Sequence, residues 1–140
     1  MRDSLFFEMF EDFEVEVLTR FYVHAVEEHS YVEDELLKNR IKVERVRGAS
    51  CFSKDTDIRA MIVKMVRNSS KILVWLDSDR KEDFVIKAKK ADCGKKFLND
   101  KSHNWSNGAL PCDTIVLILG KRFDKAGCLE GFYVKTCYPE

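Results

Sequence analysis

Residues 114–119 read Thr-Ile-Val-Leu-Ile-Leu, a β-branched and apolar run that is typical of a strand buried in the middle of a sheet. Further along, residues 131–138 read Gly-Phe-Tyr-Val-Lys-Thr-Cys-Tyr and alternate along the chain. We therefore expect antiparallel strands over 113–119 and 131–138. The stretch 120–130 between them should form a long hairpin loop.

Upstream of these strands the chain changes period. Phe84, Ile86 and Ala88 alternate and predict one more strand. The polar stretch between Lys89 and Pro111 is rich in lysine, asparagine and glycine, and we expect it to be irregular.

The first half of the chain has helical spacing instead. Residues 4–18 predict a helix with one apolar stripe, made by Phe6, Met9, Phe10, Phe13 and Val17. Residues 54–67 predict the clearest helix, whose apolar positions are Ile58, Met61, Ile62, Met65 and Val66. Ser30-x-x-Glu33 has the form of a capping box, which predicts a further helix over residues 31–39.

Helices followed by an antiparallel sheet indicate an α+β fold. The chain has 140 residues, and apolar residues make up 45% of them, which suits one domain over residues 1–140 with a substantial core. We see no internal repeat and no linker.

The formal net charge is zero, but the charges are unevenly distributed. Residues 1–36 hold eleven acids and two bases, which leaves 22 bases and 13 acids in residues 37–140. The body of the protein is therefore basic and its N-terminal arm acidic. A site on the basic side can still collect phosphate groups.

The five cysteines form no CxxC pair and have no metal-ligand spacing, so we expect reduced thiols and no metal site. No apolar run is long enough for a membrane helix, and an acid at Glu8 interrupts the first apolar stretch. We therefore expect no membrane association and no secretory signal. As written, the chain should be cytoplasmic, unless it is delivered into a target cell as part of a larger toxin.

The chain has three histidines, and two of them, His24 and His29, stand close together. Metal-free cleavage of RNA needs a base for the 2′-OH, an acid for the 5′ leaving oxygen and donors for the charged phosphorane. Histidine suits the first two tasks and arginine the third. On residue types alone, however, surface histidines beside acids are the simpler interpretation.

Four segments resemble the bacterial RNase A-like domains found at the C-terminal ends of contact-dependent growth inhibition toxins and related polymorphic toxins. The first is His-x-x-x-x-His at 24–29, followed by Leu36-Leu37 and Arg40-Ile41. The others are Gly48-Ala-Ser-Cys-Phe-Ser-Lys-Asp, Asn68-Ser-Ser-Lys-Ile-Leu-Val-Trp-Leu and Gly131-Phe-Tyr-Val-Lys-Thr-Cys-Tyr-Pro-Glu. The resemblance covers residues 22–140, and residues 1–20 have no counterpart in it.

This resemblance implies a kidney-shaped α+β domain with metal-independent ribonuclease activity, neutralised by an immunity protein. It implies catalytic roles for His24, His29, Arg40, Thr136 and Tyr138. The expected product is a 2′,3′-cyclic phosphate, the expected substrate is RNA such as tRNA, and no cofactor is needed. We expect a monomer.

Some residues depart from the pattern or admit a second interpretation. Glu28 stands where the family often has a lysine, so an anion replaces a cation beside the phosphate. This favours, as an alternative, an inactive homologue that binds RNA or a protein, and the acidic arm favours a plain protein-interaction module. His103 beside Trp105 suggests base stacking, although an anchor for its loop is the simpler interpretation. Candidate contacts with the RNA backbone are Lys135, Lys89 and Lys90.

Overall fold

The computed structural model describes residues 2–19 and 24–140, with side chains described for residues 4–19 and 25–140. The elements in these ranges, in chain order, are α1 (Arg2–Thr19), α2 (His24–His29), α3 (Asp34–Glu44), β1 (Gly48–Phe52), α4 (Ile58–Arg67), α5 (Ile72–Asp77), β2 (Phe84–Leu98), a 3-10 helix η1 (Trp105–Asn107), β3 (Leu110–Phe123) and β4 (Leu129–Pro139).

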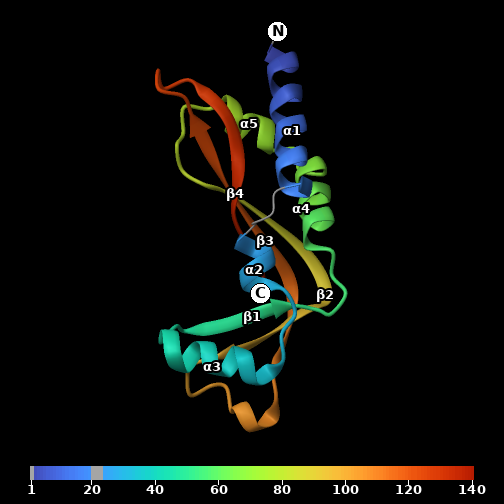
Figure 1. Ribbon diagram of the computed structural model, residues 1–140, viewed down its shortest axis with the longest axis vertical. Helices are drawn as coiled ribbons and strands as arrows, with labels where there is room; N and C mark the ends of the chain where they lie inside the picture. The colour runs from blue at the N-terminus through green and yellow to red at the C-terminus, as the bar shows by residue number, and fades with distance from the viewer. Residues whose placement is uncertain (1, 20–23) are drawn as a thin grey trace.

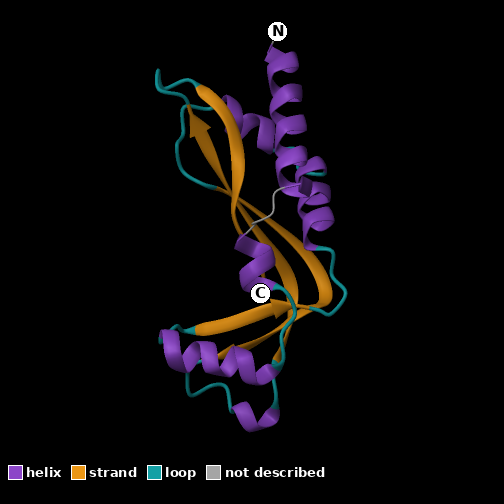
Figure 2. Cartoon of the chain, viewed as in Figure 1, coloured by secondary structure: helices purple, strands orange, loops and turns teal. Residues whose placement is uncertain are grey.

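The described strands form one antiparallel sheet in the order β1-β2-β3-β4. The sheet curls along its length, with α1, α4 and α5 beside one half and α3 beside the other end (Figures 1 and 2). The predicted α+β class is therefore confirmed, and the expected strand pair is antiparallel, with Val116 opposite Tyr138. Both strands are longer than predicted, so the hairpin connection shortens to residues 124–128.

Strand β2 corrects the prediction of an irregular stretch after Lys89, because the strand continues to Leu98. The register shifts between Lys89 and Gly94, and beyond this point β2 pairs with β1 on its outer side. Cys93 and Phe97 are buried there, while the residues around them are polar, which hides the alternation in the sequence. The segment Gly48–Phe52, which lies within the second segment of the sequence resemblance, is the strand β1.

The predicted capping box is also wrong. Helix α3 begins at Asp34, and its N-cap residue, Glu33, makes no side-chain capping bond. The hydroxyl of Ser30 donates instead to the carbonyl oxygen of Val26, inside α2. Helix α4 begins at Ile58 rather than near residue 54, because the carboxylate of Asp57 caps it by accepting the backbone N–H of Ala60 at 3.1 Å.

The main core lies between one face of the sheet and helices α1, α4 and α5. The predicted stripe of α1 is confirmed, since Met9, Phe13 and Val17 are buried. The ring of Phe13 stacks on that of Phe132 in β4, with centroids 4.5 Å apart. Helix α1, which had no counterpart in the sequence resemblance, is therefore an integral part of the core.

Two ion pairs hold α1 in place from its polar side. Glu14 accepts two hydrogen bonds from Arg67 of α4, at 2.6 and 2.8 Å, and this guanidinium holds the pKa of the Glu14 carboxyl below its usual range. Glu16 accepts a similar pair from Arg122 of β3, at 2.8 and 2.7 Å. Bidentate pairs of this kind add orientation as well as energy.

A second apolar cluster lies under α3. It is formed by Leu37, Ile41, Ala49, Cys51 and Phe97. Because strand side chains alternate, Cys51 faces α3 while its neighbour Phe52 joins the main core. The short strand β1 therefore joins the two clusters.

All five cysteines are free thiols, and only Cys128, in the β3–β4 turn, is exposed. Burial raises the pKa of the Cys112 thiol to about 11 and that of Cys137 to about 12, so both stay protonated at neutral pH. None of the helices described has the combination of length and apolar composition that a membrane crossing requires.

Replacement of Phe13 tests whether α1 belongs to the core. We expect Phe13→Ala to lower the free energy of unfolding by about 3–5 kcal/mol, because it leaves a cavity beneath Phe132. Phe7, on the same helix, is 64% exposed, and Phe7→Ala should change stability by less than about 0.5 kcal/mol. Urea unfolding of both variants measures the difference. Equal effects would show that α1 does not pack as described.

Candidate functional site

His29 is the last residue of α2 and lies half-buried against the sheet. Its Nδ1 lies 3.1 Å from the carbonyl oxygen of Ser50 in β1. A carbonyl oxygen only accepts, so Nδ1 carries the hydrogen. The neutral ring then has its lone pair on Nε2, which is the atom able to take up a proton.

Arg40 reaches the same place from α3. Its Nη1 donates a hydrogen bond of 2.8 Å to the carbonyl oxygen of Glu28, the residue before His29. The last carbonyls of a helix lack partners within the helix and favour a cation. This bond therefore fixes the guanidinium beside the histidine.

Tyr138 completes the group from β4. The centroid of its ring lies 5.9 Å from that of His29, with the planes tilted by 43°. Thr136 lies two residues earlier on the same face of the strand, which places it about 7 Å further along. It does not line the pocket described next.

His29, Arg40 and Tyr138 line one pocket of about 430 Å³, which we call the site pocket. Its other lining residues come mainly from β1, the far half of β2 and the end of β4. Among the described residues that line it, two have cationic and three have carboxylate side chains: Arg40, Lys96, Glu28, Glu44 and Glu140. Lys96 had no particular signal in the sequence, where it stood within a lysine-rich stretch.

The structure places the other candidate residues elsewhere. The side chain of His24 lies outside the described residues. Lys135 forms an ion pair with Asp83 at 3.0 Å and does not line the site pocket. Lys89 and Lys90 line a separate groove along β2.

The His103 side chain anchors its own loop through hydrogen bonds to the backbone. It is 8% exposed, its Nδ1 accepts the backbone N–H of Leu98 at 3.1 Å, and its Nε2 lies 2.8 Å from the carbonyl oxygen of Gly108. Both ring nitrogens are thus engaged by the backbone, and the ring stacks on Phe97. The interpretation as a loop anchor agrees with these contacts.

No group of three or more His, Cys, Asp and Glu side chains suited to holding a metal ion occurs among the residues described. The site pocket instead offers an imidazole, a guanidinium, a phenol and a primary amine. This set can exchange a proton and hold a negatively charged oxygen.

The sequence matches no model of a known protein family and no curated protein. The fold is similar to a chain of a solved structure, the crystal structure of the CdiA-CT/CdiI complex from Y. kristensenii 33638. The two share 20% sequence identity with a TM-score of 0.65, over 84% of this chain and 99% of that one. At this level of identity the similarity establishes a shared fold.

Gly94 controls the position of the strand that carries Tyr138. A Cβ at this position would lie 2.4 Å from the carbonyl oxygen of Cys51 and 2.7 Å from the ring of Pro139. Pro139 directly follows Tyr138, so any side chain at Gly94 pushes the end of β4 away from β1. The close approach of these strands therefore depends on the missing side chain.

We expect Gly94→Ala to lower the free energy of unfolding by about 1–3 kcal/mol, because overpacking forces the backbone apart. At Gly131, which belongs to β4, a Cβ would meet no atom within 4 Å beyond its chain neighbours, so Gly131→Ala should be close to neutral. Thermal unfolding of both variants measures this contrast. A neutral Gly94→Ala would contradict the close packing of Pro139 against β2.

Proposed function

We propose that this protein is a metal-independent endoribonuclease of the bacterial RNase A-like toxin type. The observation that carries the proposal is the grouping of His29, Arg40 and Tyr138, from three separate elements, in one pocket. The hydrogen bond to Ser50 supports it further, because it fixes the orientation of the His29 ring at the pocket, with Nδ1 as the donor.

In the proposed reaction the 2′-oxygen of RNA attacks the adjacent phosphorus. Nε2 of His29 takes the proton from the 2′-OH, and the P–O5′ bond breaks as the new P–O2′ bond forms. The leaving 5′-oxygen receives a proton, either from His29 after it has acted as the base or from His24. The products are a 2′,3′-cyclic phosphate and a free 5′-OH, so DNA is not a substrate.

The other side chains act on the phosphate. Arg40 stabilises the charged phosphorane, since a guanidinium is permanently charged and has several donors. The Tyr138 hydroxyl positions the phosphate or the base. Lys96 of β2 adds a second cation to the pocket lining.

The fold similarity to a chain of the CdiA-CT/CdiI complex supports the assignment to a toxin-type domain. That protein was crystallised as a complex with CdiI. For the present chain we propose, by analogy, a cognate immunity protein as partner and delivery into a target cell as part of a larger toxin.

The carboxylates of the site pocket favour one alternative, an inactive homologue that binds RNA or a protein partner. Glu28, Glu44 and Glu140 outnumber Arg40 and Lys96, so the pocket by itself attracts anions weakly. Catalysis requires that a phosphate reaches the pocket despite them.

A cleavage assay on total tRNA in EDTA separates these functions. We expect cleavage to persist in EDTA and to leave 2′,3′-cyclic phosphate ends, with single-stranded DNA untouched. His29→Ala should lower the rate by about 10²–10⁴, the usual contribution of general acid–base catalysis. Lys125→Ala, in the exposed β3–β4 turn, serves as the matched control. No cleavage of any RNA by the parent protein would favour the inactive homologue.

Glu28→Lys tests the electrostatics of the pocket. The variant replaces an anion by a cation while keeping the backbone carbonyl that Arg40 contacts, so we expect a cleavage rate at least equal to that of the parent. The neighbouring Glu27 is exposed and does not line the pocket, and Glu27→Lys is the control for added charge alone. Loss of activity in a folded Glu28→Lys protein would assign Glu28 a role of its own.

A further inference from the structure

Two lysines of β2 share the sheet face that carries Tyr138. Residues directly opposite one another in neighbouring strands point to the same face. Lys87 lies opposite Val116, which lies opposite Tyr138, so this row crosses the sheet in about 10 Å. The next row begins with Lys89, which lies opposite Thr114, and Thr114 exchanges two backbone hydrogen bonds with Glu140.

These lysines connect the site pocket to two further hollows. The first, the bridging hollow of about 540 Å³, shares Lys96 and Glu140 with the site pocket. It shares Lys87 and Lys89 with the second, which has a volume of about 1040 Å³ and lies between α4 and β2. We call this second hollow the edge groove, because β1 pairs only with the far half of β2 and, among the described strands, leaves the near half as an edge. Each hollow shares lining residues with the next, and we call the series of three the track.

The edge groove combines positive charge with an apolar floor. Its lysines are Lys54, Lys64, Lys71, Lys87, Lys89 and Lys90. Two acids oppose them, and one of these, Asp57, is engaged as the N-cap of α4. The apolar lining includes Met61 and Phe84, both partly exposed. Such a surface suits a single nucleic-acid strand, because the lysines can contact its phosphates and the apolar and aromatic side chains can contact its bases.

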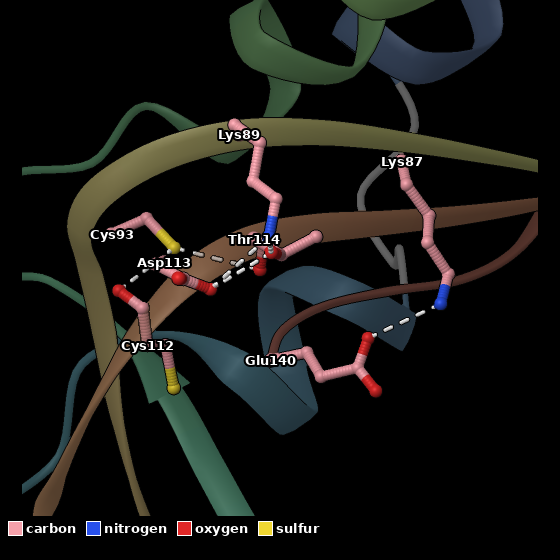
Figure 3. Close-up of polar contacts among 7 residues, drawn as sticks. All are labelled: Lys87, Lys89, Cys93, Cys112, Asp113, Thr114 and Glu140. Atoms are coloured by element: carbon pink, nitrogen blue, oxygen red, sulfur yellow. Dashed lines mark hydrogen bonds and ion pairs between the residues drawn. The ribbon is translucent and has the colours of Figure 1, made fainter.

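The contacts that the bridging lysines now make are weak. Figure 3 shows Lys87 extending from β2 to Glu140 at the end of the chain, whereas Lys89 reaches Thr114 and Asp113 on β3. Lys87 lies 3.5 Å from the Glu140 carboxylate. Lys89 donates a hydrogen bond of 3.1 Å to the Thr114 hydroxyl and lies 3.8 Å from the Asp113 carboxylate. The side chains of both ion pairs are at least half exposed. Exposed pairs of this kind contribute about 0–1 kcal/mol, so a phosphate can replace the carboxylate at little cost.

We propose that the RNA substrate continues from the site pocket past Lys96, crosses Lys89 and Lys87, and enters the edge groove. This inference rests on the proposed function, since it assigns the binding path of the same substrate. Phosphates contact the lysines of the track, and bases lie against the floor of the edge groove. The net charge of the protein is zero, and the site pocket has more carboxylates than cations. The lysines of the track therefore supply the positive charge that holds RNA.

Binding of a fluorescent 2′-O-methyl RNA oligonucleotide tests the track without cleavage, because its blocked 2′-oxygen cannot attack. We expect the double variant Lys87→Ala/Lys89→Ala to weaken binding about tenfold or more at low salt. The slope of log K against log salt concentration should become shallower by about 0.7 for each lysine–phosphate pair that the variant removes. Asp113→Asn, which removes an anion from the bridging hollow, should strengthen binding.

Two further proteins make the result specific. Lys101→Ala/Lys125→Ala removes two exposed lysines outside the three hollows and should leave both affinity and slope unchanged. His29→Ala should bind the oligonucleotide like the parent protein. Cleavage rates test the path separately from the site pocket: the Lys87/Lys89 double variant should slow the cleavage of tRNA more than the cleavage of a dinucleotide, which is too short to follow the track.

The outcomes distinguish the two proposals. If the parent cleaves RNA but the Lys87/Lys89 variant binds the oligonucleotide and cuts tRNA as the parent does, the track is wrong and the proposed function stands. If no RNA is cleaved but binding depends on these lysines, the proposed function fails and the track stands as an RNA-binding surface. Equal loss of binding in both double lysine variants would also overturn the track, since only total charge would then matter.

Discussion

Strand β2 changes direction between Lys89 and Gly94, and the remaining architecture depends on this bend. Asp92 adopts a left-handed conformation there, with φ of 53°. Ser53 closes the bend from outside, because its backbone N–H donates to the carbonyl of Cys93 and its hydroxyl to that of Asp92. The near half of β2 can thus cover the main core, while the far half pairs with β1 and lines the site pocket.

The second requirement is a fixed end for the short helix α2. A helix of six residues is unstable by itself, and its terminal carbonyls need partners from elsewhere. Arg40 donates a hydrogen bond to the carbonyl oxygen of Glu28, and the Ser30 hydroxyl donates to that of Val26. The His29 ring is hydrogen-bonded to the carbonyl oxygen of Ser50 in β1. The bonds that hold α2 in place are therefore the same bonds that orient the imidazole and the guanidinium. Stability and the geometry of the candidate site are coupled here.

Periodicity predicted the elements that show one uninterrupted apolar face, such as the strand around 131–138. It could not predict the far half of β2, where Phe97 is buried among lysines that read as a solvated stretch. The grouping of His29 with Arg40 came from the resemblance, since no local pattern brings residues eleven apart to one phosphate. Nor does local sequence distinguish His29 from His103; the difference lies in which backbone groups each ring meets after folding.

The near half of β2, an edge of the sheet as far as the described strands extend, also affects how separate copies of the protein meet. An exposed edge strand offers its backbone hydrogen-bonding groups to any other strand, and edge-to-edge association is a common route to aggregation. Lys87 and Lys89, both exposed along this edge, place like charges opposite each other whenever two such edges approach. The same positive side chains therefore oppose self-association, and a sequence change that removes them exposes a template for unwanted strand pairing.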